Sequence, residues 1–206
     1  MKSPSDFIHQ FVPGSSPRTL LLLHGTGGNE RDLIPLGRDL DANASLLSPR
    51  GKVLENGMPR FFRRLAEGVF DLEDLKYRTN ELADFVTATA QEYGFALDNL
   101  VAVGYSNGAN IAASMLLLRP GIMYAAILFR AMVPLHPEKL PDLSRAQVWI
   151  GAGDQDPIVP ASEAKRLAEL FRRAGADVTI DFTDTGHGLT NDDLEATRNW
   201  LAELKS

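Results

Sequence analysis

The chain has 206 residues, of which 44% are hydrophobic and 23% are charged, ordinary values for a globular protein. Its formal net charge of −6 argues against nucleic acid or an anionic membrane as an obligatory partner. The sequence contains no cysteine, which excludes disulfides, thiolate nucleophiles and cysteine-based metal sites. The first residues lack the apolar stretch of a signal peptide, and no run reaches membrane-spanning length. We therefore expect a single cytoplasmic domain over residues 1–206, as a monomer or a homodimer.

Apolar runs in the first part of the chain predict strands at residues 7–12, 19–24 and 44–47. The first two are expected to be joined by a turn rich in proline, glycine and serine. A helix is expected to start at Asn29, because leucines recur along one side of the stretch that follows. Residues 50–71 show no regular period and are expected to be irregular.

The rest of the chain alternates helices with apolar strands. Helices are expected at 72–93, after Ser106, at 162–174 and at 194–204, and strands at 100–103, 124–129, 147–150 and 178–182. Gly94 suits the end of the first of these helices. This alternation implies right-handed crossovers and a mostly parallel, doubly wound sheet flanked by helices, the α/β class. Residues 130–146 leave no room for a large helical lid, so we expect no large cap domain.

The centre of the sequence holds a Gly-x-Ser-x-Gly pattern, in which Ser106 stands between Gly104 and Gly108. A valine-rich run precedes the pattern and a helix of small residues follows it, which is the setting of a nucleophile elbow. In such a turn the two glycines let strand and helix approach closely. The pattern in this setting predicts that Ser106 is a nucleophile.

An acid and a base follow two later strands. Asp154 and Asp156 come after the strand at 147–150, and His187 follows the last strand between two glycines. Ligands of a parallel sheet bind beyond the carboxyl ends of its strands, where all these loops lie. The order serine, aspartate, histidine is that of an α/β-hydrolase, in which a carboxylate orients the histidine that takes the serine proton. The spacing does not choose between Asp154 and Asp156.

A tetrahedral intermediate also needs hydrogen-bond donors for its oxyanion. The backbone N–H of Asn107, directly after the expected nucleophile, is one candidate. The backbone N–H of Thr26 is the other, because Thr26 lies in the glycine-rich loop after the strand at 19–24. His24, at the start of that loop, is expected to brace it.

Four motifs spread along the chain carry a resemblance: Leu-Leu-His-Gly-Thr-Gly-Gly, Gly-Tyr-Ser-Asn-Gly, Gly-Asp-Gln-Asp-Pro-Ile-Val-Pro and Gly-His-Gly. With them the chain resembles the carboxylesterase/phospholipase family of small α/β-hydrolases, which includes acyl-protein thioesterase-like enzymes and bacterial MhqD-like hydrolases. The Met-Pro-Arg-Phe-Phe-Arg-Arg-Leu segment from Met58 is most similar to the bacterial subgroup. The resemblance implies a serine carboxylesterase and places the acid on Asp156. Many relatives have glutamine where Asn107 stands, a change expected to be silent because the backbone N–H acts.

The substrate pocket is expected beside the irregular segment and the loops after the strands. Its candidate lining residues are Phe61, Phe62, Arg64, Met132, Val133 and Ile158. The two phenylalanines suit a core as well as a pocket, and Arg60, Arg63 and Arg64 suit a solvated face. An open site without a lid suits small to medium esters, so the expected partner is a small-molecule ester.

Three other functions fit parts of the sequence. Acyl-protein thioesterase or lysophospholipase-like activity shares the chemistry and differs only in the pockets. A dinucleotide-binding domain would use the glycines near Thr26 and a phosphate partner at Arg50, but its fingerprint requires glycine where Glu30 stands. A catalytically silent ligand-binding domain is disfavoured by the complete set of nucleophile, acid and base. The four histidines are scattered without ligand-like spacing, so we expect no metal and no cofactor.

Overall fold

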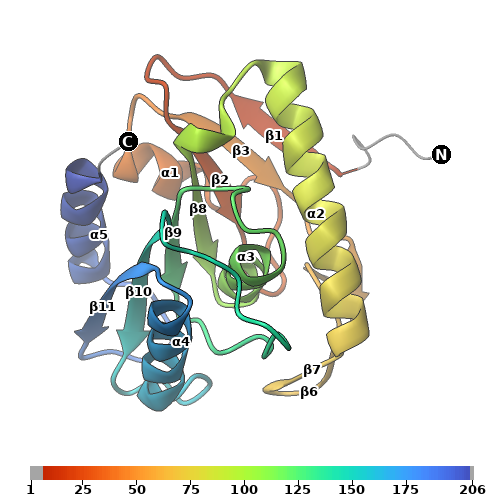
Figure 1. Ribbon diagram of the computed structural model, residues 1–206, viewed down its shortest axis with the longest axis vertical. Coiled ribbons are helices and arrows are strands. Elements are labelled where there is room, and N and C mark those ends of the chain that lie inside the picture. Colours follow the sequence, from red (N-terminus) through yellow and green to blue (C-terminus); the bar gives the residue numbers. More distant parts are fainter. Residues whose placement is uncertain (1–6, 205–206) are drawn as a thin grey trace.

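The computed structural model describes residues 7–204, and a seven-stranded sheet runs through its middle (Figure 1). The strands lie in the order β1-β3-β2-β8-β9-β10-β11, and β1 alone among them runs antiparallel to its neighbour. Their bounds are β1 (His9–Val12), β2 (Thr19–Leu23), β3 (Ser45–Pro49), β8 (Leu100–Tyr105), β9 (Ala125–Phe129), β10 (Gln147–Gly153) and β11 (Asp177–Thr183). The mostly parallel sheet predicted from the sequence is confirmed.

Helices cover both faces of this sheet (Figure 1). One face packs against α1 (Ile34–Leu40) and α5 (Asn191–Glu203), and the other against α2 (Leu72–Tyr93), α3 (Asn107–Leu118) and α4 (Ala161–Arg173). A short 3-10 turn, η1 (Leu97–Asn99), leads into β8. Residues 130–146 form neither helix nor strand, and no cap domain is evident in the part of the chain that the structure describes. None of the helices within 7–204 is both long and apolar enough to span a bilayer.

The apolar runs of the central strands reflect burial on both faces of the sheet. Successive side chains of a strand point to opposite faces. In β2, Leu21 and Leu23 join the core under α2 and α3, whereas Leu20 and Leu22 join the core under α1 and α5. A strand covered on both sides is therefore apolar throughout, as parallel strands usually are. This packing fixes the loops after β2, β8, β10 and β11 at one edge of the sheet.

The long helix α2 has the bounds that the sequence predicts, because both of its ends are marked by caps. The Asp71 carboxylate accepts the N–H of Asp74 at 3.1 Å, which satisfies a free donor of the first turn. At the other end Gly94 takes a left-handed conformation with φ 75°. The helix expected to start at Asn29 begins later, at Ile34, since Pro35 is tolerated only in the first turn and residues 30–33 form turns.

Strand β1 does not pair with β2, although a turn joins the two in sequence. It runs antiparallel to β3 at the edge of the sheet, with Phe11 opposite Leu47. The pairing of β1 with β3 joins residues that are far apart in the sequence, because β2 and α1 lie between the two strands. The tertiary arrangement, rather than the turn, sets the position of β1.

Residues 50–71 are not irregular as expected but contain two short hairpins. The first joins β4 (Val53–Glu55) to β5 (Met58–Arg60), and the second joins β6 (Arg64–Ala66) to β7 (Val69–Phe70). The turn of the first hairpin is Asn56-Gly57, whose φ angles of 51° and 80° suit a two-residue hairpin loop. Strands of two or three residues are too short to show a period in the sequence.

Candidate active site

Ser106 sits in the sharp turn between β8 and α3. Its φ of 53° is a conformation that residues with a side chain seldom adopt, and its N–H donates to the Phe129 carbonyl at 2.9 Å. A side chain at Gly108 would overlap the Leu23 carbonyl, and a Cβ at Gly104 would come within 2.6 Å of Ala109. The two glycines are therefore required for the close approach of strand and helix, which holds Ser106 in its strained turn.

His187 lies between Ser106 and Asp156. Its Nε2 is 3.0 Å from the Ser106 Oγ, and its Nδ1 is 2.7 Å from Asp156 Oδ2. The Asp156 carboxylate is fully buried. In this ring position the Nδ1–H of His187 donates to that carboxylate, and Nε2 is left to accept the serine proton. The structure thus places three residues from three separate loops in one hydrogen-bonded chain.

The geometry separates the two aspartates that the spacing leaves open. Asp156 Oδ1 accepts the backbone N–H groups of Ile158 and Val159, at 2.8 and 3.0 Å, and its other oxygen faces His187. Asp154 is exposed, and its backbone N–H bonds to the Thr183 carbonyl. Asp156 and not Asp154 therefore contacts the histidine.

The loop after β2 brings the second predicted oxyanion donor to the same edge of the sheet. Within residues 7–204, the backbone N–H groups of Thr26 and Asn107 have no protein acceptor. Gly27 takes a left-handed conformation with φ 84°, and its N–H donates to the Pro59 carbonyl at 2.9 Å. The loop after β2 and the elbow after β8 therefore each leave one backbone donor available for an oxyanion.

His24 braces this loop, as expected. Burial lowers the pKa of its ring, which is therefore neutral. Its Nδ1–H donates to the Gly25 carbonyl at 2.7 Å, and its Nε2 accepts the N–H of Gly51 at 3.0 Å. The ring joins the oxyanion loop to the chain that follows β3.

The structure distributes the predicted pocket residues between core and surface. Both phenyl rings are buried in the core: Phe61 packs on His24 and Phe62 on Phe70.

Arg64 forms an ion pair with Glu55 at 2.9 Å. The other three candidates lie after β9, where Met132 and Val133 are half-buried, and beside Asp156, where Ile158 is exposed.

The expectation of a solvated arginine face holds for Arg63 but is wrong for Arg60. The Arg63 side chain is 61% exposed, whereas that of Arg60 is 4% exposed. Arg60 donates to the Thr26 hydroxyl at 2.6 Å and to the Phe62 carbonyl at 3.2 Å. Arg60 is therefore a buried residue that contacts the loop after β2 and is not part of a solvated face.

Two further side chains hold the His187 loop, and sequence reasoning missed both. The Tyr105 hydroxyl, whose pKa is raised by burial, donates to the His187 carbonyl at 3.0 Å. Arg130, directly after β9, donates to the Gly188 carbonyl at 2.7 Å and forms a two-pronged ion pair with Asp193 at 2.7 and 2.9 Å. The sequence signals only the start of α5, through the capping box Thr190-x-x-Asp193, and carries no signal for Tyr105 or Arg130.

The Arg130–Asp193 pair is fully buried. Burial alone would raise the pKa of Asp193, but the ion pair and the hydrogen bonds from Thr190 lower it. Arg130 also has a positive φ of 54°. Arg130 therefore ties the end of β9, whose Phe129 carbonyl holds Ser106, to α5 through Asp193 and to the His187 loop through Gly188.

Arg130→Met is expected to lower the free energy of unfolding by about 3–5 kcal/mol, because it leaves Asp193 as an uncompensated buried charge. Urea unfolding monitored by circular dichroism measures the loss. The matched control is Arg198→Met, which breaks an ion pair with Asp39 whose side chains are 43% and 47% exposed. That control should cost at most about 1 kcal/mol. Equal losses in the two variants would show that burial of the Arg130 pair is not decisive.

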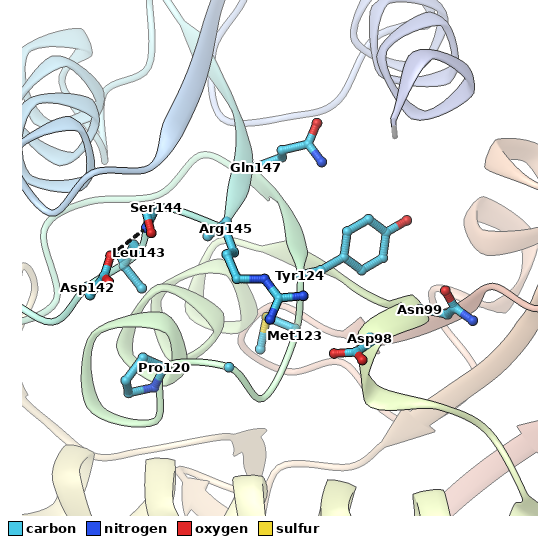
Figure 2. Close-up of a pocket in the computed structure, with 12 residues that line it drawn as sticks. Asp98, Asn99, Pro120, Met123, Tyr124, Asp142, Leu143, Ser144, Arg145 and Gln147 are labelled. Carbon is cyan, nitrogen blue, oxygen red and sulfur yellow. Dashed lines mark hydrogen bonds between the residues drawn. The ribbon is translucent and has the colours of Figure 1, made fainter. Parts of the chain in front are cut away.

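A cavity of about 700 Å³ lies at the opposite end of the sheet, beside the residues that lead into β8, β9 and β10. Figure 2 shows Asp98, Tyr124 and Arg145 among the residues that line it. None of the predicted site residues lines this cavity.

Arg50, the residue considered for a phosphate, is bound to the buried Glu30 at 2.6 and 2.9 Å. Across residues 7–204, no three histidine, aspartate or glutamate side chains are grouped so as to hold a metal ion.

The sheet order, the elbow after β8 and the polar loops at one sheet edge define the α/β-hydrolase class. The chain belongs to the dienelactone hydrolase family, whose model matches residues 63–205. It is 49% identical over 195 residues to the Bacillus subtilis (strain 168) protein MhqD, described as a hydrolase, and this match covers 95% of the chain and 98% of MhqD. The similarity to MhqD-like hydrolases expected from the sequence is thereby confirmed.

Solved structures give the same class. The Bacillus cereus carboxylesterase superposes with a TM-score of 0.94 at 48% identity, over 97% of this chain and 95% of that one. A carboxylesterase from Mesorhizobium loti superposes with a TM-score of 0.87 at 33% identity, over 93% of this chain and 91% of that one. The chain is therefore a hydrolase of the carboxylesterase-like kind.

Proposed function

We propose that this protein is a serine carboxylesterase that hydrolyses small to medium carboxylic esters through an acyl-enzyme. The observation that carries the proposal is the position of His187, within hydrogen-bond distance of both Ser106 and the buried Asp156. A serine hydroxyl is a weak nucleophile until a base removes its proton. Asp156 would orient His187 for that role and stabilise its charged form.

The reaction runs in two halves. In the first, the Ser106 Oγ attacks the ester carbonyl carbon while His187 Nε2 takes its proton, and the carbonyl oxygen becomes an oxyanion. Collapse of this intermediate breaks the bond to the alcohol oxygen, which leaves with the proton from His187, and the acyl group stays on Ser106. Water, deprotonated by His187, then attacks the acyl carbonyl carbon. Collapse of this second intermediate breaks the bond to the Ser106 Oγ, which takes the proton back from His187 as the carboxylic acid leaves.

The two free backbone donors suit the oxyanion of both halves. Donors aimed at a developing negative charge contribute about 3 kcal/mol each to transition-state stabilisation. The Thr26 N–H belongs to the loop after β2, and the Asn107 N–H belongs to the first turn of α3. No cofactor enters these steps, and the partner is a small-molecule ester.

The surroundings of the site favour uncharged esters. Every arginine of the 60–64 stretch is paired with an acid: Arg60 and Arg64 with Glu55, and Arg63 with Asp71. Exposed apolar side chains lie nearby, with Met58 against Gly27 of the oxyanion loop and Ile158 two residues after Asp156. A carboxylate on the substrate would find no free arginine among these three residues.

A panel of p-nitrophenyl esters tests the proposal. We expect acetate, butyrate and octanoate to be hydrolysed, with kcat/KM falling for palmitate and for a hemisuccinate that carries a free carboxylate. A matched thioester is included, because preference for a long-chain thioester would favour the acyl-protein thioesterase alternative. If the wild-type protein hydrolyses none of these esters faster than the Ser106→Ala protein does, the proposed function is overturned.

A further inference from the structure

The residues 58–62, hereafter the 58–62 segment, contact both residues that supply the proposed oxyanion donors. Arg60 donates to the hydroxyl of Thr26 at 2.6 Å, and the Pro59 carbonyl accepts the N–H of the next residue, Gly27. On the other side, the backbone N–H of Phe61 donates to Asn107 Oδ1 at 2.8 Å. Three consecutive residues of one segment therefore touch two loops that come from different strands.

The 58–62 segment is itself held firmly from behind. A side chain at Gly51 would overlap the backbone of Arg60, and the N–H of Gly51 is bound by His24. Arg60 is further fixed by the Phe62 carbonyl and by Glu55, whose carboxylate lies 3.3 Å from its guanidinium. A segment packed this tightly can transmit a fixed geometry to the residues that it contacts.

The contact with Phe61 accounts for the buried position of the Asn107 side chain, which is unfavourable in itself. It is 2% exposed, and its amide nitrogen, also buried, has no hydrogen-bond partner within the described residues. An unpaired buried donor costs about 1–3 kcal/mol. The interaction that is made is that of the Asn107 side-chain oxygen, which accepts the Phe61 N–H. The Asn107 side chain therefore has a contact of its own beside its backbone N–H.

We propose that the 58–62 segment positions the oxyanion hole, with Arg60 fixing Thr26 and the Phe61 backbone fixing Asn107. This inference rests on the proposed esterase function. Arg60 is a positioning residue: its charge-assisted hydrogen bond to the Thr26 hydroxyl sets the direction of the Thr26 backbone N–H. Because the oxyanion is absent from the bound ester and forms only as the serine attacks, misalignment of its donors lowers kcat and leaves KM nearly unchanged.

The test removes the hydrogen bond from each side. Thr26→Val deletes the hydroxyl but keeps size and backbone N–H, and Arg60→Met deletes the guanidinium but keeps an apolar stem. Each is expected to lower kcat for p-nitrophenyl butyrate by about 10-fold to 100-fold, part of what loss of a whole donor costs. The double variant should lose no more than the worse single variant, because both changes remove one interaction. Thr26→Ser should restore most of the kcat lost in Thr26→Val.

Two readouts distinguish positioning from mere support of the fold. A trifluoromethyl ketone, which forms a tetrahedral adduct with the serine, should bind more weakly by the same factor as kcat/KM falls. KM should stay nearly unchanged while kcat falls, since the donors act on the oxyanion and not on the bound ester. Arg18→Met, which breaks a half-buried ion pair with Asp41 away from the site, is the folding control and should keep wild-type kcat.

Wild-type kcat in Thr26→Val, or additive losses in the double variant, would overturn the positioning role while leaving the esterase function intact. Thr26→Val decides the question even where Arg60→Met does not fold, because the threonine is exposed. Absence of ester hydrolysis in the wild-type protein would instead overturn the proposed function and this inference with it.

Discussion

Ser106→Ala is expected to lower kcat for p-nitrophenyl butyrate by at least about 10⁴-fold, and toward the 10⁶-fold known for removal of a serine nucleophile. The change removes the only hydroxyl that lies 3.0 Å from His187 Nε2 within the described chain, so no acyl-enzyme can form. The fold should be retained, because Ser106 makes its structural hydrogen bonds through the backbone. Steady-state kinetics, with the rate of uncatalysed hydrolysis subtracted, measures the loss of kcat.

The matched control for this change is Ser114→Ala. Ser114 is a buried serine of α3, the helix that follows Ser106, and its hydroxyl donates to the Asn110 carbonyl at 2.9 Å. Its kcat should remain within about twofold of wild type, as expected for loss of a local helix hydrogen bond far from the reaction. Comparable activity in Ser106→Ala and Ser114→Ala protein would remove Ser106 from the mechanism.

Asp156→Asn is expected to lower kcat by about 10⁴-fold, the size of effect seen when a triad histidine is held in the wrong tautomer. The backbone N–H groups of Ile158 and Val159 require an acceptor at Oδ1, so the new amide must turn its NH₂ group toward His187. The His187 Nδ1 then becomes an acceptor and Nε2 carries the proton. A protonated Nε2 cannot accept the proton of Ser106.

Asp154→Asn is the control for this second prediction, since it makes the same chemical change two residues away. Asp154 is exposed and does not contact His187, so its kcat should change by less than about twofold. Parallel kinetics of both variants on one ester gives the comparison. A larger loss in Asp154→Asn than in Asp156→Asn would move the acid to Asp154.

Much of the fold is predictable because its signals are local. The ends of α2 are marked by Asp71 and Gly94, and the central strands are continuous apolar runs. The hairpins within 50–71 and the position of β1 are not predictable in this way. The hairpin strands are too short to show a period, and β1 finds its partner through a pairing decided by the whole sheet.

The same division applies to the site. Ser106, Asp156 and His187 stand out because the proposed nucleophile, acid and base follow separate strands in the chain order of an α/β-hydrolase. Arg60 and Arg130 do not stand out, because a charged residue is normally exposed. Their partners, Thr26 and Asp193, lie 34 and 63 residues away in the sequence, so only the folded chain shows these pairs.

The most direct test of the central claim is labelling with a fluorophosphonate probe, followed by mass spectrometry of the digested protein. Such a probe forms a covalent adduct only with a serine that a neighbouring base activates. We predict one adduct, on the peptide that contains Ser106, and its loss in Ser106→Ala protein. An unlabelled wild-type protein, or an adduct on a different residue, would contradict the account.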